Sequence, residues 1–318
     1  MSDPRPTPVR WQLLLAFAIV YVVWGSTYLG IRYAIDTIPP LLMAGTRFLT
    51  AGSILLVWSL STNKARPSWR HWRTALVMGT LMLLCGNGFV TLAEQRIPSG
   101  LAALLVASEP LLLVLVAWAA PRGLRPTGRD FAGIIIGIAG VAILVWPSDL
   151  SGPGADLIGA GLVLAAALCW AVGSIYGIDA PSAPAPILAN GMTMLCGGVL
   201  LFVSGVARGE VPQVHPEKIS AVSFAAWAYL VVFGSILAFS AYTYLLTATT
   251  PAKASTYAFV NPVVAVMLGW LVASEPLTVR SLSAMAAIVA AVVILTTGHR
   301  RKAEPKPEFV AEPCAAAE

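Results

Sequence analysis

Apolar residues in this chain form long continuous runs that are separated by short polar connections. The runs last about twenty residues, which is the length of a helix that crosses a hydrocarbon core about 30 Å thick. They lack the alternation over about ten residues that marks membrane-spanning strands. The pattern predicts an all-α integral membrane protein with ten transmembrane helices, near residues 11–33, 40–60, 72–94, 98–120, 128–146, 157–178, 184–206, 222–246, 251–273 and 279–297.

The run from Ser99 to Trp118 returns 152 residues later, within Ala252 to Leu271. Four identical pairs mark this repeat: Ala102 and Ala254, Pro110 and Pro262, Val114 and Val266, and Trp118 and Trp270. The next run, 128–146, likewise fits 279–297, so the repeating unit holds five helices. Because five is odd, the second unit enters the membrane from the opposite face. The sequence therefore predicts two inverted-topology five-helix repeats, residues 11–147 and 157–298, an architecture typical of secondary transporters.

Lys and Arg fall mainly on one side of the predicted helices. If residues 1–10 are cytoplasmic, 14 Lys and Arg lie on the cytoplasmic side and 5 on the other, with Arg47 inside the membrane. This bias predicts that both termini are cytoplasmic and that 148–156 is an extracytoplasmic linker. The tail, 299–318, is charged and rich in Pro, Glu and Ala, which is typical of disorder. The first apolar run is too long for a signal peptide and lacks its cleavage site.

Composition supports the membrane class and narrows the chemistry. Hydrophobic residues make up 58% of the chain and charged residues 11%, and the mean hydropathy is +0.79, which excludes an ordinary soluble domain. The net charge of +5 comes from cations scattered between the apolar runs, so we expect no nucleic-acid partner. The four cysteines show no CxxC spacing, and the three histidines lie outside or at the edges of the runs. We expect no metal, no cofactor and no catalytic residues.

Each copy of the repeat places a polar residue directly before its central proline. Glu109 precedes Pro110 in the first copy, and Asn261 precedes Pro262 in the second. Both pairs lie about ten residues into their helices, which is about 15 Å deep and close to the midplane. Pro110 and Pro262 are predicted helix-break positions beside a polar cavity, because proline removes a backbone donor. A carboxylate at that depth is costly, so function is the default interpretation of Glu109.

Aromatic and amide side chains at similar depth complete a candidate binding site. Trp24 and Trp170 each lie about thirteen residues into the first helix of a repeat unit, and Asn87 lies between two glycines. The predicted substrate-binding residues are Trp24, Tyr28, Asn87, Glu109, Trp170 and Asn261.

Packing offers an alternative interpretation of several polar and aromatic residues. Asn261 can bond to backbone freed by Pro262, and Asn87 can serve helix packing. Tyr242 and Tyr257 fit a core or a helix interface at least as well as a cavity wall.

Arg47 and Glu109 differ in depth by about 5 Å, which an Arg side chain can span. They form either a structural ion pair or a coupling pair in which Glu109 takes a proton or faces a cationic substrate. A carboxylate held by a guanidinium stays ionised, which favours the structural interpretation and facilitated transport. Glu94 and Arg96 lie near the outer boundary and are predicted to form a solvated edge.

Several segments together resemble the EamA family of the drug/metabolite transporter superfamily. They are WGSTYLGIR from Trp24, Arg47-Phe48, the Glu109-Pro110 and Asn261-Pro262 helices, and Glu275-Pro276-Leu277-Thr278 before the last helix. The stretches 86–94 and 257–269 look most like its YedA-like members. The resemblance covers 11–298 and implies two EamA units of five helices, a multi-pass carrier in the plasma (inner) membrane, and export of small metabolites, amino acids or drugs. The first repeat departs from it, with Arg122, Leu124 and Arg125 where such units often have an acid like Glu275.

Two other classes of function remain open. A receptor or scaffold without transport leaves the inverted repeat unexplained, and an intramembrane enzyme lacks HExxH and GxSxG motifs. The missing P-loop argues against ATP as the energy source. The expected partners are the lipid bilayer and a small-molecule substrate, neutral or zwitterionic because charge is scarce in the site. The GxxxG spacing of Gly133 and Gly137 fits packing within a monomer or a contact in a homodimer.

Overall fold

The computed structural model describes residues 10–62, 66–119, 128–145, 156–249 and 257–298. Within these ranges every regular element is helical, as the sequence predicts. The disordered tail 299–318, nearly all of the linker 148–156, residues 1–9 and the segment with Arg122, Leu124 and Arg125 lie outside the described residues.

The helices of the first half coincide with the first five apolar runs. In chain order they are α1 (Arg10–Ile19), the π-helical η1 (Val20–Trp24) and α2 (Gly25–Ala34); α3 (Pro40–Thr62); α4 (Trp69–Met78), the π-helical η2 (Gly79–Asn87) and α5 (Gly88–Ala93); α6 (Ser99–Val106) and α7 (Glu109–Ala119); and α8 (Gly128–Val145).

The helices of the second half coincide with the remaining runs. They are α9 (Leu157–Asp179); α10 (Pro186–Ala207); the 3-10 turns η3 (Val211–Gln213) and η4 (Pro216–Lys218); α11 (Ala221–Tyr229), the π-helical η5 (Leu230–Leu237) and α12 (Ala238–Ala248); α14 (Tyr257–Ala273); and α15 (Val279–Gly298).

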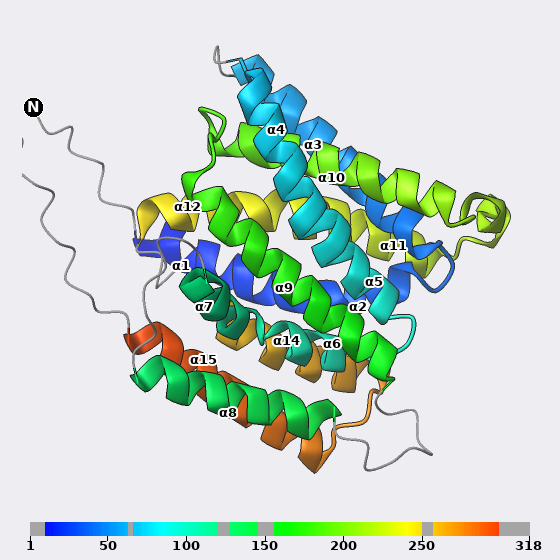
Figure 1. Ribbon diagram of the computed structural model, residues 1–318. Helices are drawn as coiled ribbons and strands as arrows, with labels where there is room; N and C mark the ends of the chain where they lie inside the picture. The colour runs from blue at the N-terminus through cyan, green and yellow to red at the C-terminus, as the bar shows by residue number, and fades with distance from the viewer. Residues whose placement is uncertain (1–9, 63–65, 120–127, 146–155, 250–256, 299–318) are drawn as a thin grey trace, which may run out of the picture.

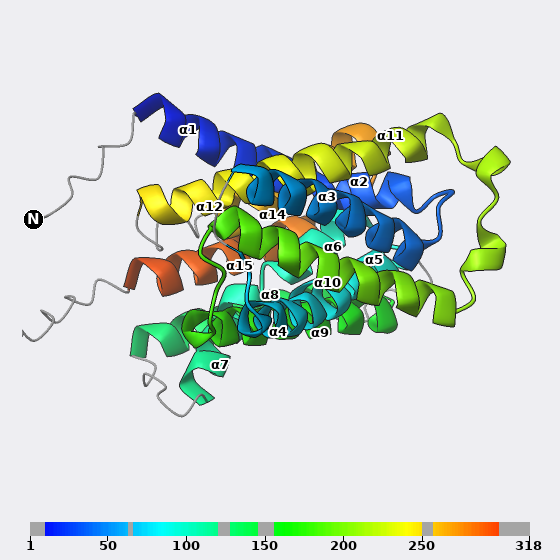
Figure 2. The same ribbon diagram turned by 90° about the horizontal axis from the view of Figure 1, so that it is seen from above.

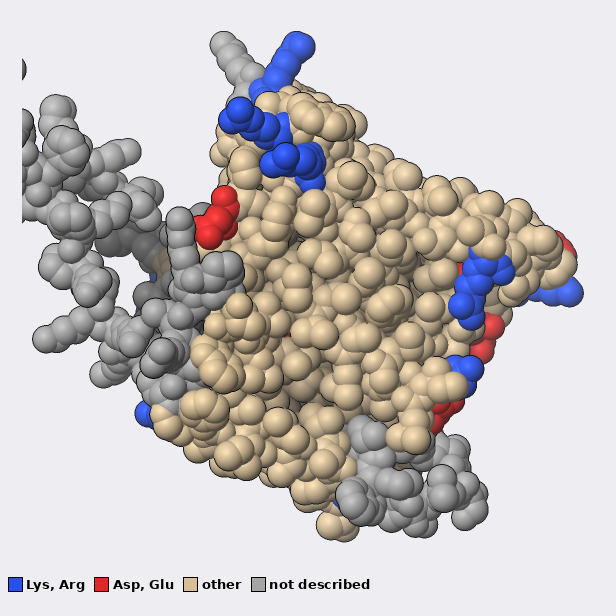
Figure 3. All heavy atoms as spheres, in the orientation of Figure 1, with Lys and Arg blue, Asp and Glu red and all other residues tan. Residues whose placement is uncertain are grey.

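Length and composition make this a multi-pass membrane bundle. Among the described residues, seven helical segments are long and apolar enough to cross a membrane, and three shorter apolar helices lie at Phe131–Ile143, Val260–Ala273 and Val279–Ile294. Large apolar side chains such as Val57, Trp58 and Leu271 are exposed on the outside of the bundle. Figure 3 shows a broad surface without charge between charged groups at its two ends. Such a belt suits contact with lipid.

Both ends of the described chain lie at the same end of the bundle. In Figures 1 and 2, α1 begins and α15 finishes on the left. The opposite end, which we call the distal end, holds the short connections 35–39, 94–98 and 274–278 and the longer connection 208–220.

Helices α3 and α10 pack closely, and so do α8 and α15. A Cβ atom on Gly52 would lie 2.7 Å from the backbone nitrogen of Leu195, and one on Gly198 would lie 2.7 Å from that of Leu49. Only glycine allows so close an approach of two helix backbones. In α8, a Cβ on Gly140 would lie 2.9 Å from Ile288 of α15, so this face packs within the chain.

The two central prolines affect their helices differently. The fourth apolar run is broken at Ala107 and Ser108, so that Glu109 and Pro110 begin α7. By contrast, α14 continues through Pro262, and the prediction of a helix break there is wrong. The helix thus stays continuous although Pro262 removes one backbone donor inside it.

Three runs contain π-helical segments that the sequence does not predict. They are η1, η2 and η5, in the first and third runs of the first half and the third run of the second half. Trp24 ends η1 and Asn87 ends η2. Such segments often mark functional sites, because the wider turn displaces side chains from their helical positions.

Candidate functional site

A cavity between the two halves of the chain brings together all six residues predicted to bind substrate. Trp24, Tyr28, Asn87 and Glu109 reach it from the first half, and Trp170 and Asn261 from the second. The empty space, including the part open to solvent, is about 960 Å³. Arg47, Pro110 and Pro262 also line it.

An aromatic cluster fixes Trp24 in the wall. Its ring centroid lies 5.2 Å from that of Phe239 and 5.1 Å from those of Tyr242 and Tyr257. The indole Nε1 donates to the carbonyl oxygen of Gly234 at 3.3 Å. With its polar edge satisfied and its ring packed on three sides, the indole presents a rigid apolar surface.

On the other half, Trp170 of α9 packs against η2. A Cβ atom at Gly86 would lie 3.0 Å from the Trp170 ring, so the glycine makes room for the indole. The next residue, Asn87, has a buried side-chain oxygen without a hydrogen-bond partner in the structure. An unpaired buried acceptor on a cavity wall is suited to a donor on a ligand.

Asn261 connects two helices as well as lining the cavity. With its amide nitrogen turned toward the nearby carbonyls, it donates to Tyr257 within α14 and to Tyr21 in η1, both at 3.2 Å. Part of its role is therefore hydrogen bonding to backbone, although neither carbonyl is the one that Pro262 leaves without its helical donor.

The structure does not join Arg47 to Glu109 in an ion pair. Arg47 Nε donates to Ser235 Oγ at 2.9 Å, Nη1 has no partner, and the guanidinium lies 4.6 Å from the Phe48 ring centroid. Glu109 is half-buried at the first position of α7, where the helix dipole favours a negative charge. Both residues line the cavity, but Arg47 turns toward η5. Both charges therefore remain available to the cavity.

The sequence predicts that Glu94 belongs to a solvated edge, and this prediction is wrong. Its exposed fraction is 0%, and neither carboxyl oxygen has a hydrogen-bond partner in the structure. Its neighbour Arg96 is exposed, in agreement with the prediction. Glu94 differs because Arg32 of α2 donates to its backbone oxygen at 2.8 Å and the connection folds inward.

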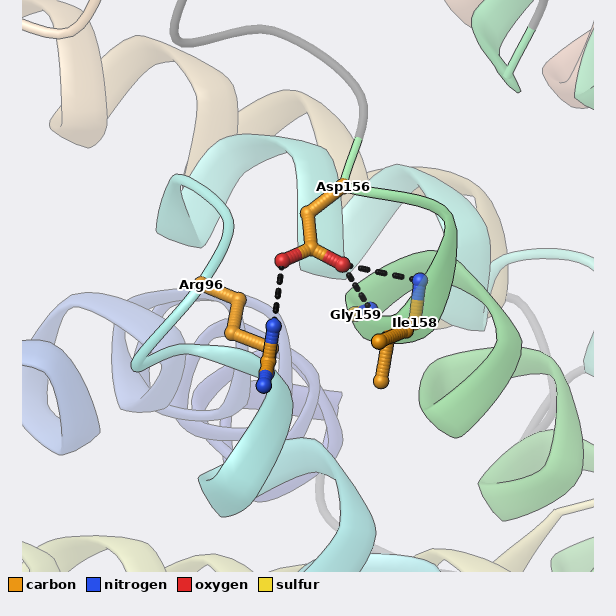
Figure 4. A network of polar contacts seen from close by, with 4 residues as sticks. All are labelled: Arg96, Asp156, Ile158 and Gly159. Atoms are coloured by element: carbon orange, nitrogen blue, oxygen red, sulfur yellow. Dashed lines mark hydrogen bonds and ion pairs between the residues drawn. The ribbon is translucent and has the colours of Figure 1, made fainter.

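Figure 4 shows how Arg96 and the start of α9 are joined. Arg96 Nη1 pairs with Asp156 Oδ2 at 2.7 Å, while Oδ1 accepts from the amides of Ile158 and Gly159 at 2.8 and 3.0 Å. The hydrogen bond from Arg96 and the amides of Gly159 and Ile158 lower the pKa of Asp156. The carboxylate thus caps α9 and ties it to the connection before α6.

Two further carboxylates bind helix starts at the distal end. Glu275 accepts from the amides of Ser99 and Gly100 at the start of α6, at 2.8 and 2.9 Å. Glu210 Oε2 accepts from the amides of Leu41 and Leu42 in α3, at 2.9 and 3.0 Å. Burial raises the pKa of Glu210, and these two amides oppose that shift. These contacts join the two halves at the distal end.

Sequence reasoning missed several cavity residues. The cavity is also lined by Thr27, Phe239 and Tyr257. From the sequence, Tyr257 fitted a core position at least as well as a cavity wall. Helix depth alone does not say which way a side chain turns, and Phe239 follows the unpredicted η5. Among the described residues, no group of three His, Cys, Asp or Glu side chains lies close enough together to hold a metal ion.

Known proteins resemble this chain over nearly its whole length. It is 40% identical over 295 residues to the uncharacterized inner membrane transporter YedA of Escherichia coli strain K12, covering 91% of this chain and 94% of that protein. It is 27% identical to the uncharacterized transporter YvbV of Bacillus subtilis strain 168, covering 91% and 92%. A crystal structure 20% identical in sequence superposes with a TM-score of 0.63 over 92% of this chain and 99% of that one, and supports the fold alone.

The sequence profile of the EamA-like transporter family matches residues 11–146 and 157–297 separately. These ranges hold the two sets of helices whose side chains meet in the cavity. The family match and the 40% identity to an inner membrane transporter together show that this protein is a membrane transporter. The chain belongs to the EamA-like transporter family.

Proposed function

We propose that this protein is a secondary transporter of the inner membrane that exports a small metabolite, amino acid or drug-like compound by alternating access. The observation that carries the proposal is the cavity lined from both halves, with Trp24 and Glu109 on one side and Trp170 and Asn261 on the other. A site between two repeats lets relative movement of the repeats expose it to either face of the membrane.

Helix pairing supports two inverted repeats, 11–147 and 157–298. Corresponding helices of the two units pack on each other: α3 on α10, α6 on α14, and α8 on α15. The first run of each unit packs on the third run of the other: α2 packs on α11, and α9 packs on η2 and α5. This is the pattern expected of two similar units related by a two-fold axis in the membrane plane.

The charges on the cavity wall suit a zwitterionic or neutral substrate. Glu109 and Arg47 both line the space and are not paired with each other. A carboxylate and a guanidinium that stay separate can bind an ammonium and a carboxylate of one small molecule. Trp24 and Trp170 supply apolar surface for the rest of it.

Orientation follows from the distribution of Lys and Arg. The bias of 14 against 5 in the sequence supports cytoplasmic termini and hence an extracytoplasmic distal end. In this conformation the carboxylates of Glu275 and Glu210 join the two halves at the distal end. Export requires these contacts to open while the opposite end closes.

A comparison of metabolites in the medium of cells with and without the protein tests the function and identifies the substrate. We expect at least one small neutral or zwitterionic compound to accumulate outside only when the protein is present. Purified protein in liposomes should then carry that compound, whereas liposomes without protein should not. Normal expression with no difference in the medium and no flux in liposomes would contradict transport and favour a receptor or scaffold.

A further inference from the structure

Glu94 is the most isolated acid among the described residues. It follows α5 directly, is completely buried, and has no hydrogen-bond partner on either carboxyl oxygen in the structure. The other acids near it are hydrogen-bonded or face the cavity: Glu275 caps α6, and Glu109 lies on the cavity wall. Helix packing alone requires no acid at such a position.

An ionised carboxylate in this environment would be strongly unfavourable. Removing a charge from water costs several kcal/mol even after relaxation, and the cost is recovered only where hydrogen bonds or an ion pair replace water. Glu94 has neither here. A proton on the carboxyl group removes the charge and most of that cost, so the neutral acid is the form that fits this conformation.

A complementary unsatisfied group lies on α3. Arg47 is 3% exposed, and its Nη1 has no partner in the structure, although Nε is bound to Ser235. Arg47 and Arg32 act on Glu94 electrostatically, yet neither guanidinium makes an ion pair with it within 4.0 Å. The structure thus holds a buried carboxyl group and a buried guanidinium that interact electrostatically without forming an ion pair.

We propose that Glu94 is a proton-binding residue of this carrier, neutral in the conformation seen here and paired with Arg47 after it loses its proton in the alternate conformation. The inference rests on the proposed transport function. In the step between the two forms, the O–H bond of Glu94 breaks and the proton passes to water on the side to which the cavity opens. The carboxylate then pairs with Arg47, whose charge does not change.

The groups that face Glu94 favour this two-state behaviour. Glu275 is a negative charge nearby that favours the neutral acid, whereas Arg32 and Arg47 favour the carboxylate. Tyr28, on the cavity wall, also interacts with Glu94. Because Arg47 and Tyr28 line the substrate cavity, the protonation state of Glu94 is transmitted to the binding site.

Infrared spectroscopy tests the proton site without a known substrate, because the probe is the proton itself. Full-length protein in ether-linked lipids, which lack ester carbonyls, should show the C=O stretch of a protonated carboxylic acid at neutral pH, shifted in D₂O. We expect Glu94→Gln to lose most of the band and Glu109→Gln to keep most of it. The exposed acid Glu217 supplies a control, and Glu217→Gln should also keep the band. A wild-type protein without the band, or a band of unchanged intensity in Glu94→Gln, would overturn the proposal.

A second variant protects the test against misfolding. If Glu94→Gln does not yield a monodisperse helical protein, Glu94→Asp retains an acid and should retain a protonated carboxyl band at a shifted frequency. Its absence from folded Glu94→Asp counts against the proton site as well.

Flux measurements in liposomes test the coupling and separate it from transport itself. With the compound identified in the medium, wild-type flux should change several-fold in an imposed pH gradient. Glu94→Gln should keep exchange at equal pH and lose that response. Wild-type flux that ignores the pH gradient, or that responds only to Na⁺, would refute proton coupling while transport stands. The infrared band without any wild-type flux would refute the transport function instead.

Discussion

Glu275 binds Ser99 twice, although the two residues are 176 positions apart in the chain: Oε1 accepts from the backbone amide at 2.8 Å and from the hydroxyl at 2.7 Å. Oε2 accepts from the amide of Gly100 at 2.9 Å. The connection between α14 and α15 is held in place for this contact by Ser274, whose φ of 53° turns the chain. One carboxylate therefore fixes the start of α6 to the other half of the protein.

Loss of the Glu275 carboxylate should loosen the distal end. Glu275→Ala leaves the first amides of α6 without an acceptor, which costs about 1–3 kcal/mol. We expect a lower midpoint of thermal unfolding in detergent, with the helix content before melting unchanged. Glu217→Ala removes an exposed carboxylate and is the matched control, expected to leave the midpoint unchanged. An equal midpoint in both variants would contradict the capping role.

The close contact between α3 and α10 should not tolerate a side chain at its glycines. Gly198→Leu forces apart backbones that leave no space for a Cβ atom, and we expect a loss of about 1–3 kcal/mol or more. The readout is the midpoint of thermal unfolding. In α9, a Cβ on Gly161 meets nothing within 4 Å, so Gly161→Ala should be neutral or slightly stabilising. If Gly198→Leu were as stable as Gly161→Ala, the packing described here would be incorrect.

The distal Arg96–Asp156 pair predicts a defined pH dependence. The lowered pKa of Asp156 means that its stabilising contribution is complete above the unfolded value of 3.8 and is lost as pH falls through the folded value. The difference in melting midpoint between wild type and Asp156→Asn should therefore be constant from about pH 8 to pH 5 and should shrink only below about pH 4. A difference that changes near neutral pH would assign the effect to another group.

The predicted topology places Lys64 and the C-terminus on the cytoplasmic side. Reporter tags inserted near Lys64 and after Glu318 should both report cytoplasm, because an even number of crossings separates each from the N-terminus. Opposite locations would require an odd number of crossings and would exclude the inverted repeat.

Depth along a helix was the part of the site that the sequence could predict. The apolar runs locate the helices, and counting residues along them brings Trp24, Asn87, Glu109 and Asn261 to one level, where the structure lines a single cavity with them. Proline chemistry also predicted the break before Glu109.

Direction around a helix and contacts between distant segments were beyond the sequence. Arg47 has the depth needed to reach Glu109 but turns to Ser235, because η5 packs on that side of α3. Glu94 lies at a helix end that residue counting places near water, yet it is completely buried, and Arg32 of α2 donates to its backbone oxygen. Such contacts depend on the packing of helices far apart in the chain, which no local pattern encodes.

The most direct test of the account is the flux of the identified compound through liposomes that contain Trp24→Ala or Trp170→Ala. Both indoles line the cavity, one from each half, so each change should lower flux about tenfold or more, equivalent to about 1.4 kcal/mol of lost binding. Trp58→Ala removes an exposed indole on the outside of the bundle and should leave flux unchanged. If both cavity variants are expressed and folded normally and carry the compound as fast as the wild type, the substrate does not pass between the two halves.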